Sequence, residues 1–250
     1  MTQIIMKKKI KSLLNISPLM IYERSRDWKI RKKRNRTRKE SINKYLKNHE
    51  KIKLQIGCGQ NFLNGWLNTD LNGLDGAMYM DAGEQFPFEN ESIDFIYSEH
   101  IFEHLTIKQQ INMMKEAYRV LKNGGVMRLA TPKLDFLFEL YSQPTKKENN
   151  EYVKWAVKSI PNLRIAQDKI LNNSSHYPYV INNFFRDWGH QMIHNFESFQ
   201  NLAYQSGFAT VRKVEVGESE IEDLRKIEKH GTIIPEHINS LETMVIELIK

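Results

Sequence analysis

The stretch Lys53-Leu-Gln-Ile-Gly-Cys-Gly-Gln60 runs from a short apolar segment into two glycines separated by one residue. A second stretch, Trp66-Leu-Asn-Thr-Asp70, ends on a carboxylate. Glycine lacks a Cβ atom, so a backbone that carries it can turn sharply and approach a ligand closely. In an open α/β sheet, ligands bind where strands end, and an acid at the tip of the second strand can accept hydrogen bonds from ribose hydroxyls. Together the two segments predict a pocket for an adenosine-containing cofactor.

The glycine pair alone does not distinguish a nucleotide loop from a plain strand-to-helix turn. The third glycine of the dinucleotide fingerprint is missing, because Gln60 and Asn61 stand in its place. The remaining motifs of the chain have to decide between the two.

The composition predicts a protein of the reducing cytoplasm. The chain has 250 residues, enough for one α/β domain with additions, and no run approaches the roughly 18 apolar residues of a membrane span. The amino terminus lacks the long apolar core of a secretory signal. Cys58 is the only cysteine, which excludes an internal disulfide and disfavours a cysteine-built metal site.

The basic residues are concentrated ahead of the glycine loop. Residues 1–50 carry 16 Lys and Arg against 4 Asp and Glu, whereas the rest of the chain carries 21 against 26. Such an arm is compatible with a solvated segment without a partner, with an anionic membrane surface, or with nucleic acid. An apolar segment precedes the basic block, an order that favours a peripheral membrane contact through residues 1–45 over nucleic acid. Its apolar residues are Ile10, Leu13, Leu14, Ile16, Leu19, Met20 and Ile21.

Strand and helix patterns alternate from residue 51 onward. A helix is expected over Ile107–Leu121, where apolar residues recur at spacings of three and four, and another over Phe196–Ser206. This rhythm indicates a parallel sheet with covered faces. The expected strands are residues 51–56, 65–70, 77–80, 92–97, 126–130, 209–216 and 243–249.

Residues 133–190 interrupt the rhythm with a helical, aromatic-rich segment, which predicts a cap inserted after the fifth strand. The expected organisation is therefore a basic, partly helical arm over residues 1–50 and a domain over residues 51–250. Most aromatic residues of the cap are expected in its core, and some at an acceptor pocket.

Five motifs, in order, give residues 51–132 a clear resemblance to the class I S-adenosylmethionine-dependent methyltransferases. The chain is similar to the group known as the methyltransferase-domain family, and the resemblance implies a Rossmann-like, mostly parallel seven-stranded sheet with helices on both faces. The matching segments are Lys53–Gly59, Asp70, Asp81-Ala82, Phe86–Ser98 and Glu116–Gly125.

The same resemblance implies S-adenosylmethionine as the cofactor. It assigns the methionine part to the glycine loop, the ribose to Asp70 and the adenine edge to Asp81-Ala82. The cofactor-binding residues that it implies are Gln55, Gly57, Cys58, Gly59, Asp70, Leu71, Asp81, Ala82 and Glu99.

The chain departs from this family in two places. Most relatives carry an acid at the position of Gln55 and a third small residue at that of Asn61. The run from Gly59 to Asp70 is also short, so the helix between the first two strands must be reduced to a turn or a loop. This compact loop resembles a subgroup often associated with polysaccharide biosynthesis.

Methyl transfer to oxygen or nitrogen requires alignment of the acceptor and, in many cases, a general base, for which histidine is suited. His100 and His104 follow the fourth strand, where the family places acceptor-side residues. His190 is a third candidate for the acceptor pocket. The alternative for each is a structural histidine; Glu103 is expected to pair locally.

His190 and His194 are four residues apart and would share one face of a helix. The pair lacks the intervening acid of the zinc-protease motif and an evident third ligand. We therefore expect no metal site.

Two absences bear on the acceptor. No Asn/Asp-Pro-Pro-aromatic motif follows the fourth strand, and Cys58 lies in the cofactor loop rather than at a nucleophile position. Both disfavour a nucleic-acid substrate. The sequence predicts methyl transfer to a hydroxyl or similar group on a glycan, a sugar-lipid precursor or a small metabolite. An RNA methyltransferase and a catalytically inactive cofactor-binding scaffold are the alternatives, and no feature indicates the oligomeric state.

Overall fold

The computed structural model describes residues 37–72, 75–164 and 176–250. No helix within these three ranges is long and apolar enough to cross a membrane.

The chain divides into two units, residues 1–48 and 49–250. Of the first unit, the structure describes a helix over residues 37–48. The apolar segment and most of the basic block of the predicted arm fall in residues 1–36, which lie outside the described residues. The second unit contains all the elements considered below.

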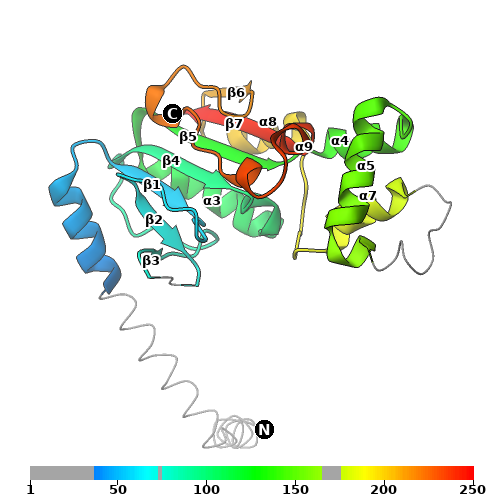
Figure 1. The fold of residues 1–250 in the computed structure, drawn as a ribbon. Helices are drawn as coiled ribbons and strands as arrows, with labels where there is room; N and C mark the ends of the chain where they lie inside the picture. The colour runs from blue at the N-terminus through cyan, green and yellow to red at the C-terminus, as the bar shows by residue number, and fades with distance from the viewer. Residues whose placement is uncertain (1–36, 73–74, 165–175) are drawn as a thin grey trace, which may run out of the picture. The chain divides into compact units, whose positions relative to one another are not determined.

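The second unit is built on a seven-stranded sheet with the strand order β3-β2-β1-β4-β5-β7-β6 (Figure 1). Neighbouring strands among β1 to β5 pair in parallel, whereas β7 runs antiparallel to both β5 and β6. The predicted seven-stranded α/β sheet is therefore confirmed, as a mixed sheet with one reversed strand. The strands are β1 (Lys53–Ile56), β2 (Leu67–Asp70), β3 (Met78–Tyr79), β4 (Ile93–Glu99), β5 (Leu121–Pro132), β6 (Thr210–Val214) and β7 (Thr243–Ile249).

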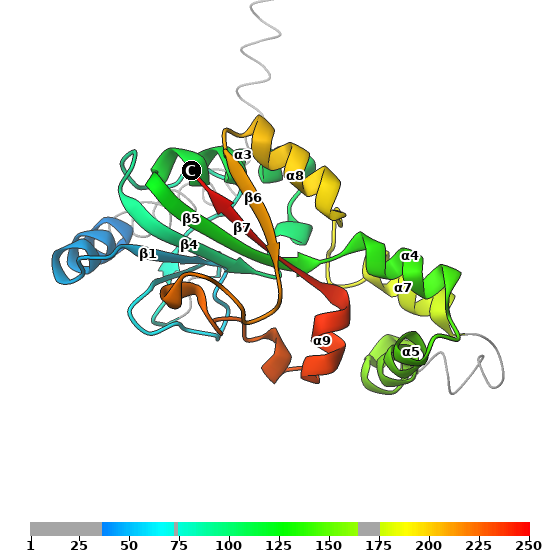
Figure 2. The same cartoon turned by 90° about the horizontal axis from the view of Figure 1, so that it is seen from above.

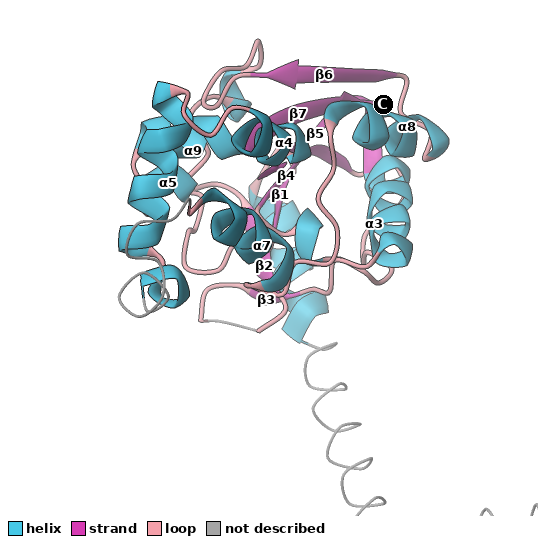
Figure 3. Ribbon diagram, turned by 90° about the vertical axis from the view of Figure 1, so that its right-hand side faces the viewer, coloured by secondary structure: helices cyan, strands magenta, loops and turns pink. Residues whose placement is uncertain are grey.

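Two amphipathic helices, α3 (Ile107–Val120) and α8 (Phe196–Gln205), cover one face of this sheet (Figure 3). Helix α3 begins with a capping box, in which Thr106 and Gln109 satisfy each other's backbone N–H groups. Asn195 caps α8 by accepting the backbone N–H of Ser198. Both caps use donors that the first helical turn leaves unpaired.

The opposite face of the sheet differs from the prediction of helices on both faces. Its apolar cluster comes from loops and from the short turn η2 (Glu222–Leu224), which pack on strands β4 and β5. The segment between β1 and β2 is too short for a helix with its two turns, so it crosses this face as a loop. The cluster consists of Leu63, Trp66, Tyr97, Val126, Leu224 and Ile227.

Strand β5 begins at Leu121, immediately after α3, and not at residue 126 as the sequence pattern predicts. Leu121 pairs with Ile93 of β4, and the ladder then shifts register before Phe95 pairs with Val126. The Lys122–Gly125 turn is thus included in the strand as an irregularity.

The motif Glu116–Gly125 has a structural function that explains its spacing. Glu116 accepts the backbone N–H of Phe86 at 2.8 Å, and Arg119 donates to the carbonyl oxygens of Phe86 and Phe88. Arg119 also pairs with Glu116, and this hydrogen bond holds the pKa of Glu116 below its ordinary value. Helix α3 is therefore fastened to the segment that leads into β4.

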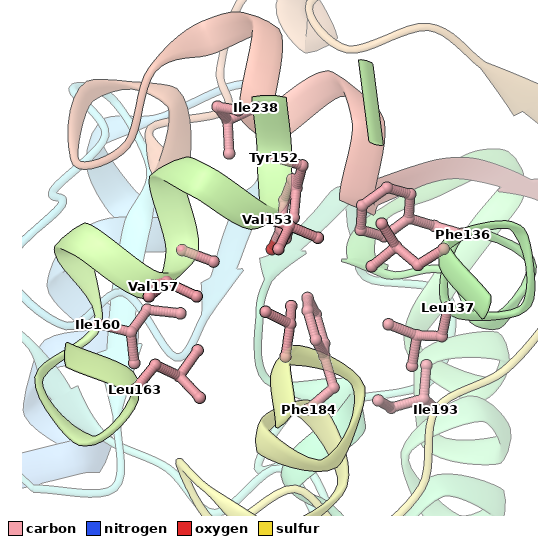
Figure 4. Packing of buried hydrophobic residues seen from close by; sticks show 13 residues of the cluster. Phe136, Leu137, Tyr152, Val153, Val157, Ile160, Leu163, Phe184, Ile193 and Ile238 are labelled. Carbon is pink, nitrogen blue, oxygen red and sulfur yellow. The ribbon is translucent and has the colours of Figure 1, made fainter. Parts of the chain in front are cut away.

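Helices α4 (Leu134–Ser142), α5 (Lys147–Ser159) and α7 (Tyr177–Arg186) lie between β5 and α8, where the sequence predicts a helical insertion (Figure 2). They have a core of their own, in which Phe136, Tyr152 and Phe184 are almost fully buried (Figure 4). Not all aromatic residues of the cap belong to this core, because the side chains of Phe138 and Tyr141 are about two-thirds exposed.

The two ends of this cap lie side by side at the carboxyl end of strand β5. Lys133 forms a parallel β-bridge with His194, and the backbone N–H of Leu134 donates to the carbonyl of His194 at 2.9 Å. The chain thus enters and leaves the cap at one point.

A buried charged cluster fixes the segment between β6 and β7 to the loop-covered face. Arg128 of β5 is fully buried and pairs with Glu228 at 2.5 Å and with Glu247 at 2.7 Å. Its Nη1 also donates to the carbonyl of Glu218. Two carboxylates therefore surround one guanidinium in the interior.

Candidate functional site

The glycine loop has the backbone that its sequence predicts. Gly57 and Gly59 both have positive φ angles, of 69° and 50°, a conformation that side chains with a Cβ rarely adopt. The backbone N–H of Gly59 donates to Asp70 Oδ2 at 3.0 Å, so the acid at the end of β2 holds the loop that follows β1. Asp70 Oδ1 accepts the N–H of Asn72 at 2.8 Å.

The two glycines are required for different reasons. A Cβ atom on Gly57 would lie 2.2 Å from Cγ1 of Ile101, so this glycine is needed for the contact with the segment after β4. A Cβ atom on Gly59 would meet no atom within 4 Å. The open space over Gly59, beside the carboxylate of Asp70, fits the close approach of a nucleoside such as that of S-adenosylmethionine.

The side chain of Gln55 forms hydrogen bonds within the loop that follows β1. Its Nε2 donates to the carbonyl of Asn61 at 3.0 Å, and its Oε1 accepts the N–H of Leu63 at 3.3 Å. The sequence places Gln55 among the cofactor-binding residues. In the structure its amide is instead committed to the loop that replaces the first helix.

The remaining cofactor-binding candidates lie around the ends of the strands. Asp81 follows β3 and accepts the backbone N–H of Gly83 at 2.8 Å, and the neighbouring Ala82 is buried. Leu71 is half-exposed just after Asp70.

Glu99 does not face the cofactor loop with a free carboxylate. Its two oxygens accept the backbone N–H groups of Lys229 and His230 at 2.9–3.0 Å. Glu99 therefore holds the segment before η3 (His230–Thr232) against the end of β4, in place of the predicted contact with the cofactor.

Cys58 is buried between the two glycines, and this burial, together with the charge of Asp70, raises the pKa of its thiol to about 11. Since the thiolate is the reactive form, we expect the folded protein to react very slowly with a thiol-specific disulfide reagent at pH 7 to 8. One equivalent should react promptly after unfolding in urea. Rapid modification of the folded wild-type chain at pH 7, absent in Cys58→Ser, would contradict this assignment.

Close to the loop, a cavity of about 610 Å³ opens at the ends of β4 and β5. All three histidines predicted for acceptor chemistry, His100, His104 and His190, line it. No Lys or Arg is among the described residues that line the cavity. The other polar and aromatic residues of its wall are Glu103, Tyr152, Trp155, Ser159, Phe184, Trp188, His230 and Glu242.

His100 directly follows β4 and is held in an unusual conformation. Its φ angle is 51°, and its Nδ1 donates to Oε1 of the fully buried Glu103 at 3.0 Å. Oε2 of Glu103 accepts the hydroxyl of Thr131 at 3.2 Å. The other ring nitrogen of His100, Nε2, is buried without a hydrogen-bond partner among the described residues.

Burial and charge act in opposite directions on this pair. Burial lowers the pKa of His100, but the hydrogen bond and negative charge of Glu103 outweigh it, so the pKa of His100 lies above its ordinary value. Burial likewise raises the pKa of Glu103, and His100 reverses this effect, so the pKa of Glu103 is lowered. The pair therefore stabilises a proton on His100.

A second histidine, His230, lies next to His100 and is close to a carboxylate of its own. It was not identified from the sequence. The ring of His230 lies 4.0 Å from that of His100, and its Nε2 lies 3.4 Å from Glu242. The hydroxyl of Tyr152 donates to the same Glu242. No local motif marks these residues, because they come from α5, η3 and α9 (Glu236–Glu242).

His190 and His194 do not form the helical pair that the sequence predicts. Helix α7 ends at Arg186, and residues 190–194 are not helical. His194 is buried against Gln110 and Ser198, at 3.0 Å from each. His190 instead contacts the ring of His104, with the ring centroids 4.9 Å apart.

Comparison with known proteins identifies residues 54–129 with a methyltransferase domain. Among solved structures, the chain is similar to an S-adenosylmethionine-dependent methyltransferase from Archaeoglobus fulgidus, with 16% identity, a TM-score of 0.47, and coverage of 87% of this chain and 94% of that one. It is also similar to such an enzyme from Mesorhizobium loti, with 14% identity, a TM-score of 0.43, and coverage of 80% and 90%. No curated protein matches the sequence.

Proposed function

We propose that this chain, which contains a methyltransferase domain over residues 54–129, transfers a methyl group from S-adenosylmethionine to a hydroxyl or similar group of a glycan, a sugar-lipid precursor or a small metabolite. The observation that carries the proposal is the cavity at the ends of β4 and β5, which His100 lines. The buried ring nitrogen Nε2 of His100 has no hydrogen-bond partner among the described residues. The cofactor, when bound, supplies a methyl group on a sulfonium, which is already activated for in-line displacement.

The sheet register supports a shared reaction centre. Ile56 pairs with Ser98, so the glycine loop and His100 leave the sheet from neighbouring positions on adjacent strands. Ile101 closes against Gly57 between them. This register supports the proposal that an acceptor bound in the cavity lies near the glycine loop to which we assign the methyl donor, the alignment that methyl transfer requires.

His100 is suited to orient and deprotonate a hydroxyl. Nδ1 is fixed by Glu103, so Nε2 is the atom that can accept the hydrogen bond of the acceptor. When the methyl–sulfur bond of the cofactor breaks and the O–CH₃ bond forms, Nε2 of neutral His100 would take the hydroxyl proton, and the carboxylate of Glu103 would stabilise the resulting imidazolium.

The walls of the cavity favour a small or ring-shaped acceptor over RNA. Trp155 and Trp188 offer aromatic surfaces for the apolar faces of a sugar ring. Glu103 and Glu242 make the cavity acidic, whereas a nucleic-acid groove needs Lys and Arg for the phosphates.

The acceptor is tested by transfer of a labelled methyl group from S-adenosylmethionine to separated cell fractions: small sugars, glycan lipids and total RNA. We expect label in a sugar-containing fraction. Label confined to RNA, or label in no fraction from a chain that binds S-adenosylmethionine, would overturn the proposal.

Once the acceptor has been identified, His100→Gln is expected to lower kcat by about 100-fold or more, because a positioned base contributes at least that factor. The affinity for S-adenosylmethionine should remain unchanged. His237→Gln is the matched control, since His237 is exposed and lies outside the cavity lining. Wild-type kcat in His100→Gln would remove His100 from the mechanism.

A further inference from the structure

We propose that Glu103, His104 and His190 bind one divalent transition-metal ion in the floor of the cavity. One ligand atom from each of these residues lies within 4.8 Å of the other two, the only such cluster of three among the described residues. Zinc binds nitrogen and carboxylate oxygen at about 2.0–2.2 Å in tetrahedral geometry, so the ligands around one ion lie about 3.3–3.6 Å apart. The three side chains therefore have to move closer together to close around an ion.

A hydrogen bond within the chain determines which ring nitrogen of His190 can bind a metal ion. Its Nδ1 donates to the carbonyl of Phe184 at 2.8 Å, which places the ring proton on Nδ1 and leaves the lone pair on Nε2. Histidines that bind metals characteristically donate their other N–H to a carbonyl or carboxylate in this way.

The two chain segments that supply the ligands are also fastened together. The backbone carbonyl of Glu103 accepts the N–H groups of Gln191 and Met192, at 2.7 Å and 3.2 Å. These bonds hold His190 beside residues 103 and 104 in the absence of any ion. The backbone that carries the ligands is therefore preorganised, which lowers the cost of binding.

The charge of the cavity favours a cation. Glu103 is fully buried, and Glu242 lines the same wall, where the described residues include no Lys or Arg. The carboxylate of Glu103 is oriented by His100 and Thr131 and can still coordinate an ion through a remaining lone pair.

Two imidazoles and one carboxylate suit Zn²⁺, Mn²⁺, Fe²⁺ or Co²⁺ better than Mg²⁺ or Ca²⁺, which prefer oxygen ligands throughout. Three protein ligands leave coordination positions open toward the cavity. An acceptor oxygen bound there would have a lowered pKa beside His100; this use of the metal rests on the proposed function, whereas the site itself does not.

Binding is tested on the tag-free full-length chain after treatment with a chelator. Titration with Co²⁺, followed by its visible absorption bands, and with Zn²⁺, followed by calorimetry, should each show one equivalent per chain. His190→Ala and His104→Ala should each weaken binding by more than about 100-fold, beyond the loss typical of residues that only orient a ligand. His237→Gln and His194→Gln should bind as the wild type does.

Folding of each variant is checked by circular dichroism. Absence of Co²⁺ and Zn²⁺ binding by the wild type, or equal binding by a folded His190→Ala, would overturn the site. If the chain transfers methyl groups but binds no metal, the metal site is overturned and the proposed function still stands. Metal binding accompanied by transfer that a chelator does not reduce would overturn only the catalytic use of the ion.

Discussion

Arg128→Met is expected to lower the free energy of unfolding by about 3–5 kcal/mol, the cost of removing one partner from a buried ion pair. The substitution leaves Glu228 and Glu247 in the interior without their cation. Methionine fills much of the volume of the arginine stem. The loss of stability therefore reflects the two unpaired buried carboxylates more than a cavity. Urea unfolding followed by circular dichroism measures it.

A matched triple variant separates charge from packing. Arg128→Met combined with Glu228→Gln and Glu247→Gln removes both carboxylate charges and should recover most of the lost stability. A loss below about 1 kcal/mol in the single variant would mean that water reaches the cluster, because solvent-exposed pairs contribute only that much.

Asp70→Ala is expected to weaken S-adenosylmethionine binding by about 10- to 100-fold. The carboxylate is the ribose ligand implied by the family resemblance, and hydrogen bonds to a charged group are each worth about 1.5–3 kcal/mol. It also fixes the glycine loop through the N–H of Gly59. Isothermal titration calorimetry with the cofactor gives the dissociation constants directly.

Asp70→Asn serves as the control for loop geometry, because its amide oxygen can still accept the N–H of Gly59 while the negative charge is lost. An intermediate affinity is expected. Wild-type affinity in a folded Asp70→Ala would show that the ribose does not bind at this carboxylate.

The parts of the fold that the sequence predicts well depend on short-range patterns. Strand β1, its glycine turn and the acid that ends β2 follow one another within eighteen residues, Lys53 to Asp70. Helix α3 also has its capping box at the expected start. Periodicity and local turn chemistry determine such elements.

The loop-covered face and the role of Gln55 depend on longer-range packing. Trp66 and Leu224 belong to one buried cluster there although more than half of the second unit separates them in the sequence, and no local pattern indicates this packing. Gln55 has the position of a cofactor ligand, but the trimmed loop uses both ends of its amide.

The same limit applies to the acceptor site. His100, His104 and His190 can be selected from their places in the chain, and the structure brings them to one cavity. The helical pairing of His190 with His194 was wrong, because α7 ends at Arg186. The proximity of His190 to Glu103 arises from backbone hydrogen bonds between distant segments, which spacing in the sequence cannot show.

The bridge between Lys133 and His194 has an evolutionary consequence. An insertion whose two ends meet can be lengthened, shortened or exchanged without changing the strand order of the sheet that carries it. The glycine loop after β1 lies outside the insertion, whereas much of the cavity wall lies within it. Recognition of the acceptor can thus diverge between related enzymes while the handling of the donor stays the same.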